Sequence, residues 1–69
     1  MNEGERKLVE FQYGMSGSFY TKFFEAAFNA DGYNLTRLGV GFPEEIEAVQ
    51  RFRSEPNYWQ DLEKEFRAT

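Results

Sequence analysis

The feature that most restricts how this chain can fold is a concentration of aromatic rings without a single cysteine. The stretch YGMSGSFYTKFFEAAFNADG places five rings within ten residues: Phe19, Tyr20, Phe23, Phe24 and Phe28. The chain has 69 residues, and a domain of this size buries only about 60% of its unfolded surface. Because no disulfide can form, stability must come from apolar burial, and rings are the largest apolar groups available. The rings are therefore either the core of a small domain or, in part, a surface made for a partner.

The composition excludes several kinds of site. The chain contains neither cysteine nor histidine, which removes thiolate and imidazole metal ligands and the usual general base. Twelve acidic side chains outnumber eight basic ones, and this balance argues against binding nucleic acid or anionic membranes through a general field. No apolar run approaches a membrane span, and the start MNEGERKLVEF is too charged for a signal peptide. We therefore expect a cytoplasmic protein with no cofactor and no metal, and with no direct contact with nucleic acid or membrane.

The spacing of the apolar residues predicts an all-α fold, a compact single domain of three to four short helices. The expected helices cover residues 18–29, 33–38, 43 to a break at 54–56, and 56–67. Ser16 or Ser18 is expected to cap the first of them, and Asp31-Gly32 to end it. Pro43 and Pro56 are expected to open the last two, since proline suits the first turn of a helix. Residues 1–12 are expected to form a flexible or docked arm outside the helical domain of residues 13–69.

The amphipathic pattern also predicts a shared core. Its expected members are Phe23, Ala27, Ile46, Val49, Trp59 and Leu62. Trp59 fits two interpretations, because the single tryptophan of the chain could equally anchor an interface. The four tyrosines are expected to be partly exposed, because a phenol hydroxyl needs a polar partner.

Carboxylates on the last two expected helices are the first candidates for a functional site. They are Glu44, Glu45, Glu47, Asp61, Glu63 and Glu65. Paired carboxylates can carry out acid–base catalysis or bind a divalent cation, but these are expected on solvent-facing sides, so no catalytic residue is predicted. We expect instead a negative patch that faces a basic groove on a protein partner, with Tyr58 and Phe42 as its apolar centre. An aromatic surface around Tyr20 and Phe24 is the alternative.

The run NLTRLGVGFPEEIEAVQRF has the spacing of a helix-turn-helix. A recognition helix offers basic or amide side chains to base edges near its start, whereas this one offers Glu44, Glu45 and Glu47. A small transcriptional regulator is therefore the weakest of the functions considered. Gly39-Val40-Gly41 lacks the preceding strand and the following lysine of a phosphate loop, and is expected to end a helix.

The chain resembles small uncharacterised proteins encoded by bacteriophages. The similarity is carried by YGxSGSFYTxxFEAxFxADxxNxxxLxxGFPEEIEAVxRF and the closing EPxYW, and covers residues 13–62 approximately. It brings no catalytic residue, but it implies a phage protein acting inside a bacterium. It also implies that the protein binds and inhibits or modulates a bacterial host protein, including defence machinery such as CRISPR effectors, without catalysis. The alternative is a self-associating assembly protein, and either a monomer or a homodimer is compatible with the sequence.

Overall fold

The computed structural model describes residues 1–68, and five helices joined by short turns occur among them. They are α1 (Glu3–Gln12), α2 (Ser18–Asn29), α3 (Gly32–Gly41), α4 (Pro43–Ser54) and α5 (Tyr58–Ala68). No strand occurs among these residues. The all-α prediction is confirmed, but the helix number is higher than expected because residues of the expected arm form α1.

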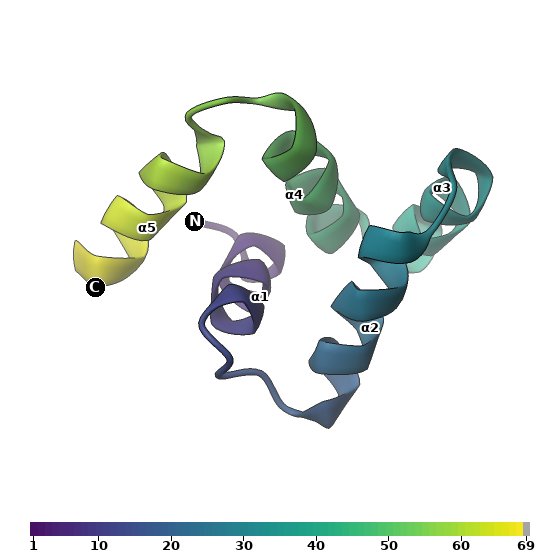
Figure 1. Cartoon of the computed structure of the whole chain (residues 1–69), viewed down its shortest axis with the longest axis horizontal. Helices are drawn as coiled ribbons and strands as arrows, with labels where there is room; N and C mark the ends of the chain where they lie inside the picture. The colour runs from purple at the N-terminus through teal and green to yellow at the C-terminus, as the bar shows by residue number, and fades with distance from the viewer. Residues whose placement is uncertain (69) are drawn as a thin grey trace.

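Helix α1 is the centre of the molecule, so the expectation of a loose N-terminal arm is wrong. Asn2 caps it: the Asn2 side chain accepts from the Glu5 amide at 2.7 Å, and the Glu5 carboxylate accepts from the Asn2 amide at 2.9 Å. This reciprocal pair satisfies two backbone donors that a helix start otherwise leaves free. Leu8 and Val9 are fully buried, and α1 contacts α2, α4 and α5, as Figure 1 shows. The polar character of residues 1–7 reflects the cap and the outer face of a helix rather than disorder.

The start of α1 lies directly against the start of α4. Gly4 is buried, and a Cβ atom built on it would lie 2.4 Å from both the Glu44 carbonyl carbon and the Glu45 nitrogen. Real Cβ atoms do not approach a backbone that closely, so only glycine permits this contact. The Gly4 amide also donates to Glu44 Oε1 at 3.4 Å. The two helices therefore meet backbone to backbone at this point.

The residues that cap the start of α2 and separate α2 from α3 differ from the expected ones. Gly17 precedes α2 without any side-chain cap, and the Ser16 hydroxyl oxygen is buried without a hydrogen-bond partner among residues 1–68, so the expected serine cap is wrong. Asp31 caps α3 instead, accepting from the Asn34 amide at 2.8 Å. Asp31-Gly32 thus begins a helix rather than ending one, because Ala30 in an extended conformation already terminates α2.

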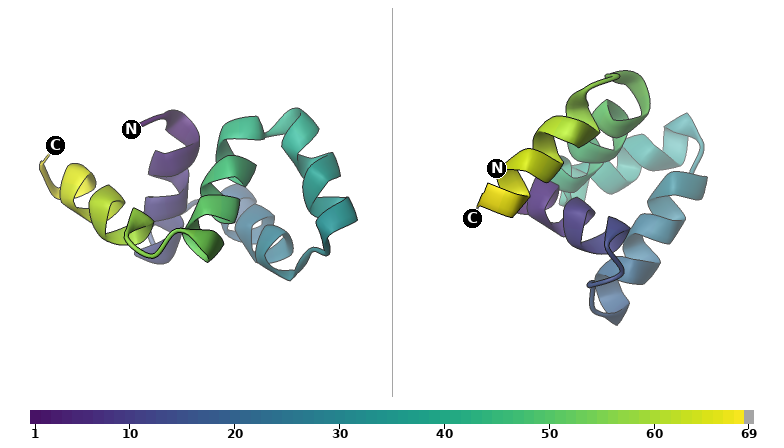
Figure 2. Two further views of the ribbon diagram at one scale, coloured as in Figure 1. Left: turned by 90° about the horizontal axis from the view of Figure 1, so that it is seen from above. Right: turned by 60° about the vertical axis from the view of Figure 1, so that its left-hand side comes forward.

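Helices α3, α4 and α5 follow one another across the molecule. Pro43 is the first residue of α4, as predicted. Pro56 lies in the turn before α5, and the first helical hydrogen bond there runs from the Asp61 amide to the Asn57 carbonyl at 3.1 Å. Helix α3 packs mainly on α4, on the side away from α5 (Figure 2). No helix of residues 1–68 is long and apolar enough to cross a membrane.

The core contains most of the predicted residues and several that the sequence did not reveal. Phe23, Ala27, Ile46, Val49 and Leu62 are buried as predicted, whereas Trp59 is only partly buried against them. The further members of the core are Leu8, Val9, Phe24, Leu35, Ala48 and Tyr58.

Candidate functional site

The three carboxylates at the start of α4 do not share a surface. Glu45 is only 7% exposed and accepts from the Tyr20 hydroxyl at 3.1 Å. Glu44 contacts the first turn of α1, and Glu47 lines a shallow groove between α3 and α4. Glu45 therefore points into the fold, whereas Glu44 and Glu47, three positions apart, lie on the same exposed side of α4. The expectation that Glu45 faces solvent is wrong.

Two of the three carboxylates on α5 attach that helix to the segments around α1. Glu63 accepts from the Tyr13 hydroxyl at 2.8 Å and lies 3.5 Å from the Arg67 guanidinium. Glu65 pairs with the amino group of Met1. Asp61 is exposed and forms no ion pair within residues 1–68. The candidate acidic residues are thus largely occupied inside the fold and do not form one negative patch.

Tyr58 belongs to a network that joins α1, α4 and α5. Its side chain is buried, contrary to the expectation of partial exposure, and its hydroxyl donates to Glu5 Oε2 at 2.8 Å. The Arg51 guanidinium lies 4.3 Å from the ring centroid and binds Glu55 through two hydrogen bonds of 2.9 and 3.0 Å. Burial, followed by the hydrogen bond to Glu5, raises the pKa of Tyr58 above its usual value of 10.0. The hydroxyl therefore stays protonated near neutral pH and acts as a fixed donor that connects helices.

The alternative surface around Tyr20 and Phe24 is only partly present. Phe24 is fully buried, so its expected exposure is wrong. Tyr20 is half-buried, and it lies beside Phe19, which is 59% exposed, with ring centroids 5.1 Å apart. The ring of Phe19 also packs beside the half-buried Phe42, and the two ring centroids lie 5.9 Å apart. A small apolar surface thus exists at this end of α2, centred on Phe19.

A larger aromatic surface lies on the face shared by α1, α2, α4 and α5. Its rings form a continuous series, here called the aromatic row: Phe11, Phe28, Phe52, Trp59, Tyr13 and Phe66. In this order, the centroids of neighbouring rings lie 5.6–6.1 Å apart. Tyr13 is 36% exposed and the other five are half-buried. The four helices and the turn after α1 therefore place six partly accessible rings in mutual contact.

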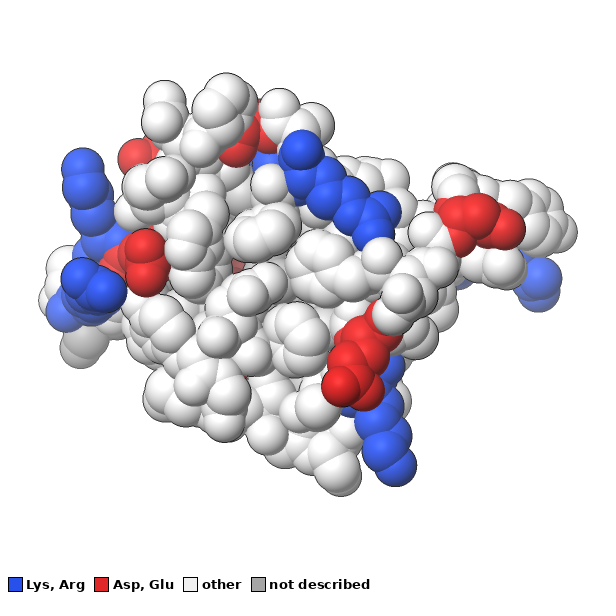
Figure 3. Space-filling view, in the orientation of Figure 1, with Lys and Arg blue, Asp and Glu red and all other residues white. Residues whose placement is uncertain are grey.

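Charged side chains border the aromatic row: Arg53 and Arg6 lie over Phe28 and Phe66, and Glu63 accepts from the Tyr13 hydroxyl. Figure 3 shows a broad uncharged area in the middle of the face that these helices present, with acidic and basic side chains around its edge. Sequence reasoning missed this site, although one signal for it was available. The apolar arc of residues 18–29 is wider than one core-facing side requires, and Phe28 is the part of that arc that reaches the row.

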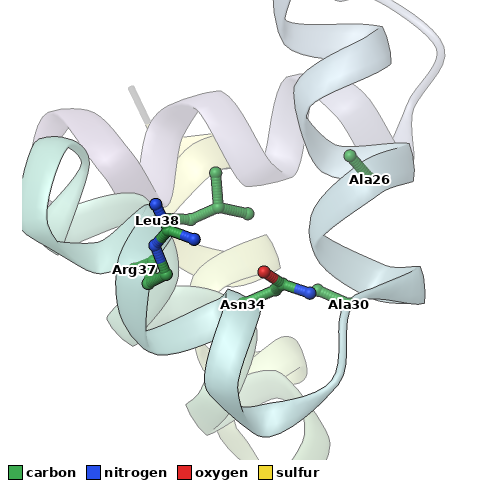
Figure 4. Close-up of a pocket in the computed structure, with 5 residues that line it drawn as sticks. All are labelled: Ala26, Ala30, Asn34, Arg37 and Leu38. Atoms are coloured by element: carbon green, nitrogen blue, oxygen red, sulfur yellow. The ribbon is translucent and has the colours of Figure 1, made fainter.

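A second hollow lies between α2 and α3. It is an open groove of about 530 Å³ lined by Ala26, Ala30, Asn34, Arg37 and Leu38. Figure 4 shows the Leu38 and Asn34 side chains pointing into the space opposite the two alanines. Asn34 and Arg37 make part of its lining polar, and none of the candidate residues from the sequence lies in it.

The described residues, 1–68, contain no group of three or more Asp or Glu side chains placed to hold a metal ion. The fold and the aromatic row define a class only: a small all-helical protein with a group of partly exposed aromatic rings. No protein-family model, no curated protein and no solved structure matches this chain.

Proposed function

We propose that this protein is a non-catalytic binding module that occupies a surface of a bacterial protein through its aromatic row. The observation that carries the proposal is the continuity of six partly accessible rings from four helices and the turn after α1. Contiguous apolar surface with a polar rim is typical of interaction sites. Tryptophan and tyrosine, both present here, are the side chains that most often dominate binding energy.

The aromatic row replaces the acidic faces as the proposed contact surface. Glu45, Glu63 and Glu65 already have partners inside the molecule, so using them for a target would cost internal contacts. The similarity to phage proteins supports a bacterial host protein as the target, and an effector of a defence system such as CRISPR fits that setting. In this proposal the protein inhibits or modulates its target by covering a surface, which requires no catalytic residue.

Self-association is a second candidate function. It is favoured by Phe19 and Val40, which are 59% and 85% exposed and lie outside the aromatic row. A helix-turn-helix regulator is less well supported than either. The start of α4, which would have to enter a DNA groove, is covered by the first turn of α1 at Gly4.

Site-specific photocrosslinking tests the proposal with a matched control inside the chain. A photoreactive phenylalanine replaces Tyr13, which lies in the row, or Tyr33, which is 71% exposed on α3 and lies outside it. Each variant is expressed in bacteria and irradiated, and the crosslinked partner is identified by mass spectrometry. We expect a specific crosslink to a bacterial protein from position 13 and none from position 33.

Other crosslinking results separate the candidate functions. Crosslinks from Tyr33 alone would contradict the proposed surface. Crosslinks from Tyr13 to a second copy of this chain, with a dimer seen by light scattering, would replace the proposal with self-association.

A further inference from the structure

Helices α2 and α3 are consecutive in the chain, yet they scarcely contact each other. Only Ala30 and Asp31 separate them, and α3 packs on α4 instead of along α2. Two helices joined by so short a connection commonly pack as antiparallel neighbours. The groove of about 530 Å³ between α2 and α3 is therefore space that neither helix fills.

The two sides of this groove differ in chemistry. Ala26 and Ala30 present methyl groups on the side of α2, and the half-buried Leu38 is the apolar part of the opposite side. Asn34 and Arg37 also line the groove, and because they are three positions apart they lie on one face of α3. Figure 4 shows the five side chains around the space. The groove thus combines an apolar surface with an amide and a guanidinium.

Both polar side chains of the groove are free of acceptors within residues 1–68. Arg37 takes part in no ion pair or hydrogen bond there and only lies over the Tyr33 ring, 5.6 Å from its centroid. The one hydrogen bond of Asn34 outside the helical backbone is donated by its main-chain amide to Asp31. The side-chain donors of Asn34 and Arg37 are therefore available to a ligand.

The charge within the groove is positive. Arg37 is the single charged residue among the five that line it. Glu25 and Asp31 adjoin lining residues in the sequence, but neither lines the groove, and Asp31 is occupied as the cap of α3. The net charge of the whole chain is −4, so an anion would be selected by contact with Arg37 and not by the general field.

We propose that the groove between α2 and α3 binds a small organic anion, a carboxylate attached to a short hydrocarbon chain. The hydrocarbon lies against Ala26, Ala30 and Leu38, and the carboxylate accepts from Arg37 and Asn34. A guanidinium can hold a carboxylate through two parallel hydrogen bonds, and the volume falls within the range of about 300–1,000 Å³ for small-molecule sites. This site is separate from the aromatic row and adds a ligand to the proposed contact with a protein.

Titration with hexanoate, followed by heteronuclear NMR of the isotope-labelled chain, tests the proposal. Hexanol has the same chain without charge, hexylammonium has the opposite charge, and acetate lacks the chain. We expect hexanoate to shift the backbone amides of residues 26, 30, 34, 37 and 38 and to saturate in the millimolar range, because the groove is open. Hexanol should bind about fivefold more weakly, since it lacks an exposed ion pair, and the other two should give no saturable shift.

Substitutions separate the two halves of the site. Arg37→Gln should reduce the affinity for hexanoate to that for hexanol and leave hexanol binding unchanged. Ala26→Leu should weaken both ligands by filling the groove, and Ala26 is exposed, so the fold should tolerate the larger side chain. Arg53→Gln, which removes a cation from the aromatic row, is the matched control and should bind hexanoate as the wild type does. The spectrum of each variant shows whether it is folded.

Three results would overturn the inference. Absence of a saturable shift with hexanoate would remove the site, and equal affinities for hexanoate and hexanol would exclude selection of an anion. Shifts at the Trp59 indole N–H in place of the groove amides would assign the anion to the aromatic row. None of these results bears on the proposed contact with a bacterial protein, which the crosslink from Tyr13 tests separately.

Discussion

Replacing Gly4 with alanine tests the closest helix contact in the molecule. The added Cβ atom would lie 2.4 Å from two backbone atoms, the Glu44 carbonyl carbon and the Glu45 nitrogen, and 2.6 Å from Glu44 Cβ. Ordinary carbon contacts are about 3.5–4.0 Å, so α1 and α4 would have to separate by about 1 Å. Backbone atoms cannot rotate aside as the end of a long side chain can. The whole interface, including the buried Leu8 and Val9, must therefore shift.

The size of the effect follows from two opposing contributions. Alanine is favoured over glycine inside a helix by about 0.5–1 kcal/mol. Overpacking of a close contact typically costs about 1–3 kcal/mol or more, and here the clash involves backbone on the partner helix. Because the clash is with backbone, the upper part of the overpacking range applies, and after subtraction of the propensity gain we expect Gly4→Ala to lower the free energy of unfolding by about 2 kcal/mol. A domain of 69 residues has a total of only about 3–10 kcal/mol, so the loss would be a large part of its stability.

Urea denaturation followed by Trp59 fluorescence and by circular dichroism measures this loss. Gly39→Ala is the matched control, because it makes the same change inside α3, where the new Cβ would lie 3.5 Å from Ile46 Cγ2. That distance is an ordinary contact, so helix propensity should dominate and the control should gain about 0.5–1 kcal/mol. A Gly4→Ala protein as stable as the wild type would refute the close approach of α1 to α4.

Three further predictions concern individual hydroxyl groups. Tyr58→Phe leaves Glu5 without its buried donor and should lower the free energy of unfolding by about 1–2 kcal/mol in urea denaturation, whereas Tyr33→Phe, on an exposed ring, should change nothing measurable. Because burial and a carboxylate partner raise the pKa of Tyr58 and of Tyr20, only the unfolded chain releases these protons just above pH 10. The wild-type melting temperature should therefore fall as pH rises beyond 10, and Tyr58→Phe should weaken that dependence. A parallel fall in both proteins would contradict the raised pKa of Tyr58. Ser16→Ala removes a hydroxyl that has no partner among residues 1–68 and should be neutral or raise stability by up to about 1 kcal/mol; a clear loss of stability would reveal a partner for it.

The sequence predicted the helices best where one strong local signal defined them. Pro43 with two glutamates after it marked the start of α4, and regular apolar spacing marked α2 and α5. Helix α1 was missed because its sequence signal is weak. The signal consists of a capping pair, Asn2 with Glu5 three residues later, and only two core residues follow it. The stability of α1 comes from α2, α4 and α5 around it, which are distant in sequence. A tertiary contact such as Gly4 against Glu44 leaves no periodic pattern to read.

The site was harder to predict than the fold, because exposure of a polar residue depends on what the rest of the chain places beside it. Glu45 and Tyr58 each lie in the first turn of a helix and carry a polar atom, which favours a prediction of solvent exposure. In the structure each of them finds one partner, Tyr20 for Glu45 and Glu5 for Tyr58, and both become buried. Such pairs, separated by 25 and 53 positions in the chain, cannot be recognised from local spacing.

The aromatic surplus has a consequence for the basic residues as well. Of eight phenylalanines, four tyrosines and one tryptophan, the structure buries only Phe23, Phe24 and Tyr58, because a chain this short has too little interior for more. Cationic side chains lie over four of the other rings: Arg6 over Phe66, Lys7 over Tyr20, Arg37 over Tyr33 and Arg53 over Phe28. A guanidinium over a ring shields apolar surface from water while its charge stays hydrated. The cationic side chains therefore reduce the apolar ring area that the free protein exposes to water.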